Sequence, residues 1–459
     1  MSRNFDAIII GAGQAGPSVV GRFTAAGMKV ALIERKFLGG TCVNTGCMPT
    51  KAMAASAYAA NLARRAGDFG VSISGKIAVD MKRVHQRAAK VTLDARSGLE
   101  RWLIGIENCS LIQGHGRFVD PHSVDVDGEL LSAPIIVINV GGRAAKPRIP
   151  GIDNVKILDN TEMVELERAP RHLVIIGGSY VGLEFAQMFR RFGTEVTVLE
   201  KGSRLVSRED EDVSASISNI LEREGITIRL NAECIRLEPH GADIRVGIEC
   251  EPGPREVVGS DVLLAVGRRP NTDDLGLNQA AIATDARGFI IVDDSLSTNV
   301  KGVFALGECN GRGAFTHTAY NDFEILAANL LDGESRRLSD RVPGYALFID
   351  PPLGRAGMTE TEARSRGLPV KVGTRSMTRV GRAIEKGETL GFMKVVANAE
   401  TGKILGGAIL GPGGDEAIHG ILNAISVGTP YRDLQWAVPI HPTVSELIPT
   451  VIRDMQERR

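Results

Sequence analysis

The chain has 459 residues, of which 43% are hydrophobic and 24% charged, a composition typical of globular proteins with a large core. Its formal net charge of −1 gives no reason to expect a nucleic acid partner. Six cysteines are too few for a disulfide scaffold, and no apolar run is long enough to cross a bilayer. We expect roughly three domains and a cytoplasmic location, because the chain enters a strand at once without a signal peptide.

The first predicted elements form a dinucleotide-binding fold. An apolar strand at 5–10 precedes a helix that extends to Gly27, and a second strand at 29–33 ends in Glu34. The turn before the helix carries the motif G-x-G-x-x-G, with its glycines at Gly11, Gly13 and Gly16. Such glycines let a pyrophosphate approach the helix N-terminus, and an acidic strand end accepts hydrogen bonds from ribose hydroxyls. The motif alone is weak evidence, but its place between strand and helix makes it specific.

Two cysteines follow, Cys42 and Cys47, at the start of a helix predicted at 48–66. In an ideal helix their Cα atoms would lie roughly 8 to 9 Å apart, whereas a disulfide needs about 4.4 to 6.8 Å. The first turn must therefore be distorted, and Gly46 offers the backbone freedom. A strained disulfide at a helix N-terminus is easily reduced, and the helix dipole stabilises its thiolate. The alternative is a pair of buried structural cysteines.

The segment 39–51, with the sequence GGTCVNTGCMPTK, resembles the active-site segment of the class I flavoprotein disulfide reductases almost letter for letter. This family includes dihydrolipoamide dehydrogenase, glutathione reductase and mercuric reductase. The resemblance implies an α/β fold with two Rossmann-like domains, one for FAD and one for NAD, and a C-terminal α+β dimerisation domain. The implied domains are 1–148 with 267–337 for FAD, 149–266 for NAD(P), and 338–459 for dimerisation.

A second dinucleotide motif follows a predicted strand at 172–176. Its glycines are Gly177, Gly178 and Gly182, and Ser179 takes the usual place of the second glycine. The next strand, 195–199, ends in Glu200, a carboxylate that would accept from the 2′-hydroxyl of NAD and repel the 2′-phosphate of NADP. We therefore expect NADH as the electron donor. Lys201 and Arg204 could weaken this preference, which keeps NADPH open, and Glu200 could instead be a solvated strand end.

The segments around the second motif complete the first domain. A long amphipathic helix is predicted within 72–103. Strands are predicted within 110–119, 123–131 and 135–140. The third strand ends in Val140, where the family usually has Thr. The segment 298–308 resembles the family's second flavin motif, in which a carboxylate holds the ribityl chain of FAD, and Glu308 stands for the usual Asp. The next residue, Cys309, is expected to be a small core filler, the alternative being a third redox thiol.

The last third of the chain resembles the interface domain through which the family forms homodimers. Strands are predicted at 392–396 and 404–410, and a helix at 413–426. The tail carries His441 and Glu446 in the family's pattern H-P-T-x-x-E. The resemblance makes His441 the acid-base residue and Glu446 its orienting partner, both serving the cysteines of the other subunit. Taken alone, a histidine before a proline is more typical of a turn.

The resemblance also assigns the path of the electrons. NADH would bind with Tyr180 as a gate and pass hydride to FAD, near which Lys51 would pair with Glu184. Electrons would continue through Cys47 to the disulfide, and Cys42 would attack the substrate. The expected cofactor-binding positions beyond those named above are Gly40, Thr41, Gly116, Gly142, Val181, Gly267 and Ala314. No metal site is expected.

The substrate stays open at this point. The segment 310–322 resembles the mercuric-reductase-like branch, but we expect neither its N-terminal metal-binding domain nor its C-terminal cysteine pair, which disfavours Hg(II). Lipoamide, a small disulfide or a protein disulfide would fit the dithiol, in either direction of reaction. The alternative function is flavin-centred reduction of metal ions such as Cu(II), or of oxidants. A non-catalytic FAD-bearing subunit is disfavoured, because the dithiol, the base and the donor motif are all present.

Overall fold

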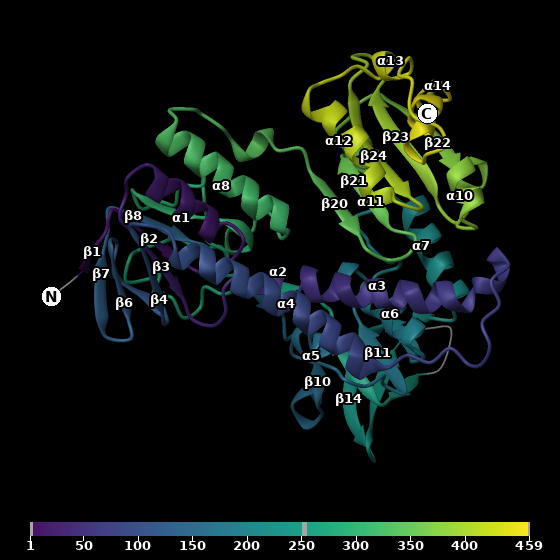
Figure 1. Cartoon of the computed structure of the whole chain (residues 1–459), viewed down its shortest axis with the longest axis horizontal. Helices are drawn as coiled ribbons and strands as arrows, with labels where there is room; N and C mark the ends of the chain where they lie inside the picture. Colours follow the sequence, from purple (N-terminus) through teal and green to yellow (C-terminus); the bar gives the residue numbers. More distant parts are fainter. Residues whose placement is uncertain (1–2, 250–254, 458–459) are drawn as a thin grey trace.

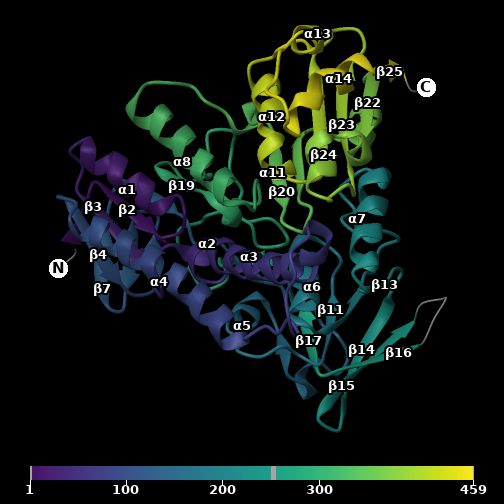
Figure 2. The ribbon, with the colours of Figure 1, turned by 45° about the vertical axis from the view of Figure 1, so that its right-hand side comes forward.

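Two parallel β-sheets and one antiparallel sheet organise the chain in the computed structural model, which describes residues 3–249 and 255–457 (Figure 1). Both parallel sheets carry helices, as Rossmann-like domains do. The antiparallel sheet belongs to a separate C-terminal domain, which stands apart from the first parallel sheet in both views (Figures 1 and 2). The α/β fold class predicted from the sequence is confirmed.

The first Rossmann-like domain contains a five-stranded parallel sheet. Its strands, in spatial order, are β19 (Val303–Ala305), β8 (Ile135–Ile138), β2 (Ala7–Ile10), β3 (Val30–Glu34) and β4 (Cys109–Gln113). The central strand β2 is fully buried, because both faces of the sheet are covered, and this explains its continuous apolar sequence. Helices α1 (Gly16–Ala25) and α8 (Thr316–Leu331) pack against each other beside this sheet (Figure 1).

A smaller sheet adjoins the first one and takes up the other predicted strands of this region. Its order is β1 (Arg3–Asn4), β7 (Glu129–Ser132), β6 (Ser123–Val126) and β5 (Gly116–Asp120). The segment 110–119 therefore divides between two sheets, because the chain leaves the parallel sheet after β4 and turns at Gly114, whose φ is +157°.

The second Rossmann-like domain has the same parallel arrangement. Its strands, in spatial order, are β10 (Ile157–Leu158), β17 (Asp261–Leu264), β11 (His172–Ile176), β12 (Glu195–Leu199) and β13 (Thr227–Arg229). A three-stranded antiparallel sheet extends from it (Figure 2), made of β14 (Glu233–His240), β15 (Asp243–Glu249) and β16 (Glu256–Gly259).

Helix α3 (Cys47–Arg64) connects the two Rossmann-like domains, because it packs against both α4 (Met81–Ile104) and α6 (Tyr180–Phe192). Helix α4 lies within the predicted segment but begins only at Met81, where the side chain of Asp80 accepts a hydrogen bond from the backbone N–H of Arg83. The residues that α4 buries recur at helical spacing, as its sequence pattern predicts.

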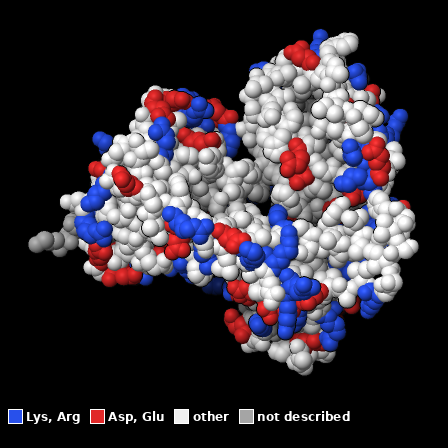
Figure 3. All heavy atoms as spheres, in the orientation of Figure 1, with Lys and Arg blue, Asp and Glu red and all other residues white. Residues whose placement is uncertain are grey.

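The C-terminal domain is a six-stranded antiparallel sheet covered by short helices. Its strands, in order, are β20 (Gly344–Leu347), β21 (Leu353–Gly357), β24 (Ile404–Leu410), β23 (Phe392–Asn398), β22 (Val370–Ser376) and β25 (Gln456–Glu457). The single helix predicted at 413–426 is two helices, α11 (Gly414–Ala417) and α12 (His419–Ser426). Figure 3 shows that the part of this domain facing the first domain is largely uncharged on the side in view.

Candidate active site

The two cysteines of the redox motif lie on two different helices. Cys42 is in α2 (Gly40–Asn44), and Cys47 is the first residue of α3. Between them the backbone leaves the helical conformation, since φ is −142° at Thr45 and −134° at Gly46. A Cβ atom on Gly46 would lie 2.9 Å from the carbonyl oxygen of Thr41. The tight turn needed to bring the two sulfurs together therefore requires a glycine at this position.

Helix α2 is held in place by side chains of its own and of α4. The amide of Asn44 donates to the carbonyl oxygens of Leu38 and Gly40 at 2.9 and 2.8 Å. The guanidinium of Arg96 donates to the Asn44 side-chain oxygen at 2.6 Å, and Thr92 donates to the carbonyl oxygen of Val43 at 3.1 Å. This five-residue helix, too short to be stable alone, is thus fixed by tertiary contacts.

The two thiols are chemically unequal. Cys42, Cys47, Cys109 and Cys309 are free thiols, and Cys42 is half-buried whereas Cys47 is exposed. The hydrogen bond from Cys42 lowers the pKa of Cys47 to about 5, with help from the Thr316 hydroxyl and the charge of Lys51. The same hydrogen bond, together with burial, raises the pKa of Cys42 above its usual range. At neutral pH Cys47 carries the negative charge and Cys42 keeps its proton.

Lys51 and Glu184, which the sequence analysis placed together, form an ion pair across the two Rossmann-like domains. The ammonium of Lys51 lies 2.7 Å from Glu184 Oε2, and the Glu184 side chain is 11% exposed. The other carboxylate oxygen accepts from the backbone N–H of Phe348 at 3.1 Å. The Lys51 ammonium also sits 4.4 Å from the centre of the Phe348 ring. Three domains therefore meet at this ion pair.

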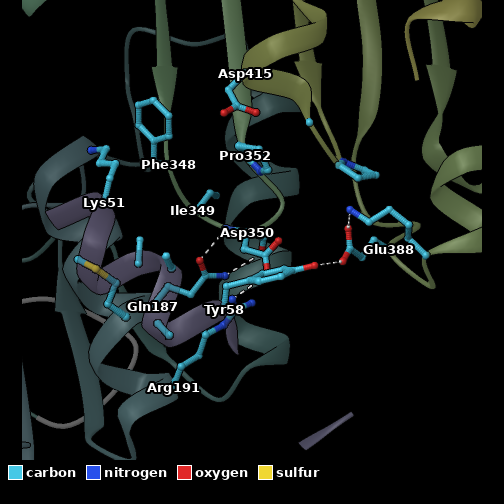
Figure 4. Close-up of a pocket in the computed structure, with 17 residues that line it drawn as sticks. Lys51, Tyr58, Gln187, Arg191, Phe348, Ile349, Asp350, Pro352, Glu388 and Asp415 are labelled. Atoms are coloured by element: carbon cyan, nitrogen blue, oxygen red, sulfur yellow. Dashed lines mark hydrogen bonds and ion pairs between the residues drawn. The ribbon is translucent and has the colours of Figure 1, made fainter. Parts of the chain in front are cut away.

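A cavity of about 360 Å³ opens beside Lys51, where α3, α6 and the segment after β20 converge (Figure 4). Tyr58 donates to Glu388 at 3.2 Å on one wall, and Arg191 pairs with Asp350 at 2.7 Å on another. The volume is in the range of small-molecule sites. Lys51 is the one predicted site residue among the described residues that line it. This cavity could not be predicted from the sequence, because its walls come from segments far apart in the chain.

The glycines of the first loop pack closely against neighbouring backbone. A Cβ atom on Gly11, whose φ is +102°, would lie 2.4 Å from the carbonyl oxygen of Asn139, and one on Gly16 would lie 2.4 Å from that of Gly11. A Cβ atom on Gly40 would lie 2.9 Å from the Cα atom of Gly13, which brings the dithiol segment against the loop. Because only glycine fits there, the N-terminus of α1 stays open to a pyrophosphate, as FAD requires.

The acidic strand ends take part in both dinucleotide loops. Glu34 Oε2 accepts from the N–H of Ala12 at 2.9 Å. In the second loop Glu200 accepts from the N–H groups of Gly178 and Gly202 at 2.6 and 2.7 Å. Glu200 is therefore a fixed part of the loop rather than a freely solvated strand end. Its carboxylate is held at the end of β12, next to the second glycine-rich loop.

The second loop repeats the close packing of the first. Gly177 has a φ of +116°, and a Cβ atom on it would lie 2.4 Å from the carbonyl oxygen of Ala265. A Cβ atom on Gly182 would lie 2.2 Å from the carbonyl oxygen of Gly177. Val181, in the first turn of α6, is 40% exposed.

Glu308 lies beside Gly142 and forms an ion pair with Arg268, a residue not singled out from the sequence. Arg268 donates to the two carboxylate oxygens of Glu308 at 2.5 and 2.9 Å, and also to the carbonyl oxygen of Gly142 at 2.6 Å. Arg268 and Gly142 belong to the antiparallel strands β18 (Arg268–Pro270) and β9 (Gly142–Ala144). Gly267, with φ at +119°, directly precedes Arg268. Glu308 is one methylene longer than the usual Asp, and Arg268 fixes the position of its carboxylate.

The remaining positions predicted to bind a cofactor lie in or beside different elements. Thr41 is in α2, and Gly116 begins β5 against the side chains of Ile10 and Ile33. Ala314 is exposed and lies just before α8. Cys309 is fully buried, and burial raises the pKa of its thiol to about 12. Such a thiol is inert as a nucleophile, which fits a core filler.

Tyr180 is the first residue of α6 and packs against two other rings. Its ring is edge-on to Tyr345, with centroids 5.3 Å apart and planes at 88°, and edge-on to Phe315 at 6.3 Å. Phe315 and Tyr345 were not singled out from the sequence. They come from the first domain and the C-terminal domain, so the ring cluster exists only after all three domains assemble.

His441 and Glu446 form the expected pair at one end of the C-terminal domain. His441 Nδ1 lies 2.8 Å from Glu446 Oε2, and the side chains are 79% and 12% exposed, respectively. Arg382 donates to the carbonyl oxygen of Pro442 at 2.7 Å and steadies the turn. Within the described part of the chain, no hydrogen bond joins this pair to Cys42 or Cys47 of the same molecule.

Comparison with known proteins identifies the family. Residues 5–322 match the pyridine nucleotide-disulphide oxidoreductases, and residues 343–452 match the dimerisation domain of that family. The chain belongs to the pyridine nucleotide-disulphide oxidoreductase family. It is 34% identical over 452 residues to the probable pyridine nucleotide-disulfide oxidoreductase RclA of Escherichia coli (strain K12), which covers 96% of this chain and 97% of that protein. Mercuric reductase of Lysinibacillus sphaericus is 32% identical over 444 residues, covering 96% of this chain and 81% of that enzyme.

A solved structure agrees with this assignment. The Cu(II) complex of the HOCl-induced flavoprotein disulfide reductase RclA from Escherichia coli matches with a TM-score of 0.89 at 32% identity, over 98% of this chain and 99% of that one. The resemblance to the flavoprotein disulfide reductases is thus confirmed. As a member of this family, the protein is an oxidoreductase that uses FAD and NAD(P)H.

The described residues contain neither a metal-binding cluster nor a helix suited to span a membrane. Within 3–249 and 255–457, no group of three or more His, Cys, Asp or Glu side chains is placed to hold a metal ion. No helix in the same residues combines the length and apolar character needed to span a bilayer.

Proposed function

We propose that this oxidoreductase takes electrons from NADH and delivers them through Cys47 and Cys42 to a disulfide substrate. The unequal acidity of the two thiols carries the proposal. A thiolate at Cys47 and a protonated thiol at Cys42 divide the work between an electron-accepting sulfur and a substrate-attacking sulfur. Bound FAD supplies the two-electron transfer that links the nicotinamide to the dithiol.

The residues around the dithiol have separate tasks. Cys42, once deprotonated, attacks the substrate disulfide, forms a mixed disulfide and releases one substrate thiol. Cys47 then attacks the Cys42 sulfur, which re-forms the Cys42–Cys47 disulfide and releases the second thiol. Each cycle consumes the two electrons and the proton of one NADH and one further proton. Lys51, fixed by Glu184, keeps a positive charge next to the Cys47 thiolate throughout.

The raised pKa of Cys42 calls for a base, and His441 paired with Glu446 is suited to this role. Since nothing joins that pair to the cysteines of its own described chain, we infer that it serves the dithiol of a second copy. Exposed apolar side chains next to His441 support a homodimer, because Trp436, Val438 and Ile440 are 78%, 95% and 80% exposed. The free thiols suit a reducing compartment such as the cytoplasm.

The second Rossmann-like domain supports NADH rather than NADPH as the donor. The carboxylate of Glu200 is held by two backbone N–H groups, so a 2′-phosphate bound there would meet a fixed negative charge. Arg204 donates instead to the carbonyl oxygen of Ser207 at 3.0 Å. Tyr180 follows the loop directly, and we assign it the role of a gate over the nicotinamide site.

One variant tests the proposed function. Cys42→Ser keeps the size of the side chain but removes the attacking sulfur. We expect turnover of disulfide substrates to fall at least a hundredfold, while NADH still reduces the flavin at the rate of the natural enzyme. Cys109→Ser, which removes a half-buried thiol outside the motif, is the matched control and should leave turnover unchanged. Disulfide turnover by Cys42→Ser would contradict the proposal.

Reduction of Cu(II) or of an oxidant is the second candidate. RclA, similar over nearly the whole chain, has been solved as a Cu(II) complex. Soft metal ions and oxidants both react with thiolates, and the Cys47 thiolate is present at neutral pH. The test is NADH consumption with and without Cu(II) in the absence of disulfide. Stimulation would favour this candidate, and an unchanged rate would exclude Cu(II) as a substrate.

A further inference from the structure

A cluster of aromatic rings joins the three domains at Tyr180. Tyr345, in β20, packs edge-on against Tyr180 and stacks on Phe315, with centroids 5.7 Å apart and planes at 18°. Phe315 also stacks on His317 at 5.4 Å, and His317 Nε2 donates to the carbonyl oxygen of Gly344, next to Tyr345, at 2.7 Å. Each of the three rings therefore contacts the other two, and the strand that carries Tyr345 is also tied to α8.

Tyr345 is anchored by a buried ion pair. Its hydroxyl donates to Glu209 Oε1 at 2.6 Å, and Arg355 Nε donates to Glu209 Oε2 at 3.0 Å. The side chains of Glu209 and Arg355 are 0% and 1% exposed. Glu209 precedes α7 (Glu211–Arg223) of the second domain, whereas Arg355 is in β21 of the C-terminal domain. A buried pair of this kind is costly to separate, so the acceptor for Tyr345 has a fixed position.

Tyr180 differs from Tyr345 in this respect. Its hydroxyl is buried and makes no hydrogen bond of good geometry with the described residues. Burial raises the pKa of Tyr180 to about 12, and the nearby Tyr345 side chain lowers it in part. A buried hydroxyl with only this poorly aligned partner opposes the conformation that buries it, whereas the ring contacts favour that conformation. Tyr180, whose burial is only weakly favoured, therefore packs against Tyr345, which is held in place by Glu209.

We propose that Tyr345 is a positioning residue that holds the Tyr180 gate closed, with the Glu209–Arg355 pair as its anchor. The proposal rests on the assignment of Tyr180 as the gate of the nicotinamide site. NADH then binds only to molecules in which Tyr180 has left Tyr345, so its apparent affinity is reduced by the fraction of closed gates. Without the cofactor the closed ring shields the flavin from solvent.

Two variants of Tyr345 test this in the oxidised holoenzyme. Tyr345→Leu removes the ring that holds Tyr180, and Tyr345→Phe removes only the hydroxyl that reaches Glu209. The dissociation constant of NAD⁺ is measured by calorimetry, and access to the flavin by iodide quenching of its fluorescence. Tyr431→Phe is the matched control, because it removes the hydroxyl of a tyrosine in α13 (Tyr431–Leu434) of the C-terminal domain, outside the ring cluster.

The expected result is a lower dissociation constant for NAD⁺ in Tyr345→Leu, by about threefold to tenfold, the factor that loss of one aromatic pair gives. Iodide quenching should increase, and the KM for NADH should fall while kcat stays within about twofold. Tyr345→Phe should change each value in the same direction by less, and it tests the proposal even where the leucine variant fails to fold.

An unchanged or higher dissociation constant in both variants would overturn the proposal, since a wall of the nicotinamide site or a purely structural residue would give that result. Neither binding of NAD⁺ nor iodide quenching requires the dithiol to turn over. Failure of the proposed disulfide chemistry would therefore show in the Cys42→Ser experiment and leave these two measurements readable.

Discussion

The ammonium of Lys51 lies 2.7 Å from the carboxylate of Glu184, and this contact joins the helix that begins with Cys47 to the helix that begins with Tyr180. The residue that supports the thiolate and the residue that follows the second dinucleotide loop are thereby fixed relative to each other. The pair lies at one end of a larger apolar contact between the two helices, which includes Met53 of α3 and Leu183 of α6. Its partial burial makes the pair stronger than a surface salt bridge.

Lys51→Met should impair both electron transfer and stability. It leaves the largely buried Glu184 carboxylate unpaired and removes a charge that lowers the pKa of Cys47. We expect the free energy of unfolding to fall by about 1 to 2 kcal/mol, because Lys51 is partly exposed, and flavin reduction to slow by roughly tenfold. Anaerobic stopped-flow absorbance and urea unfolding measure these effects. Lys90→Met, which breaks the exposed pair with Asp94 at 2.7 Å, should change neither.

The charge on Cys47 predicts a pH dependence. Its pKa in the folded protein, about 5, is below the ordinary value of 9.0, so the thiolate and its charge-transfer absorbance with the flavin should persist down to about pH 5 and vanish below it. The corresponding stabilisation of the reduced enzyme is complete above pH 9 and is lost as the pH falls through 5. A midpoint near 9 would contradict the assignment.

Thr316→Val should move that midpoint upward. The Thr316 hydroxyl lies 3.5 Å from the Cys47 sulfur and lowers the pKa of Cys47. A lost hydrogen bond to a charged group corresponds to a shift of about 1 on the pH scale. The absorbance band is titrated in both proteins, and Thr316→Ser, which keeps a hydroxyl, should restore the original midpoint.

Gly46→Ala should disturb the dithiol. Its new methyl group would lie 2.9 Å from a backbone oxygen of α2, so either α2 or α3 must shift. We expect a loss of about 1 to 3 kcal/mol in the free energy of unfolding, with slower reduction of the disulfide. Gly98→Ala in α4, where an added Cβ atom meets nothing within 4 Å, should be neutral or stabilising. Equal behaviour of the two variants in urea would show that the turn tolerates a side chain.

Glu200→Gln should relax the preference for NADH. The amide keeps one of the two hydrogen-bond acceptors for the loop and removes the charge that a 2′-phosphate would meet. The ratio of kcat/KM for NADPH to that for NADH should rise by about tenfold or more. Glu195→Gln, at the exposed start of the same strand, is the control. A ratio that does not move would assign the preference to other residues.

Local constraints made much of the site predictable from the sequence. Gly11 and Gly177 hold positive φ angles against backbone oxygens of neighbouring strands, so their motif follows from short-range geometry. The same holds for the break between Cys42 and Cys47, because disulfide geometry excludes a continuous helix. The Lys51–Glu184 pair spans 133 positions in the chain, and only resemblance to the family could join them.

Features that depend on domain assembly could not be predicted in this way. The Arg268–Glu308 pair forms where β18 pairs with β9, and no local pattern marks Arg268 as the partner of Glu308. The ring cluster of Tyr180, Phe315 and Tyr345 draws one residue from each domain. The helix predicted at 413–426 divides at Ile418, which packs closely against Gly354 of β21, a residue distant in the chain.

The central claim, that the dithiol exchanges electrons with the flavin, is tested most directly by anaerobic titration of the purified holoenzyme with NADH. The account predicts that two hydride equivalents are taken up per FAD and that a long-wavelength charge-transfer band appears with the first. Uptake of a single equivalent without that band would contradict it, because Cys42 and Cys47 would then be uncoupled from the cofactor.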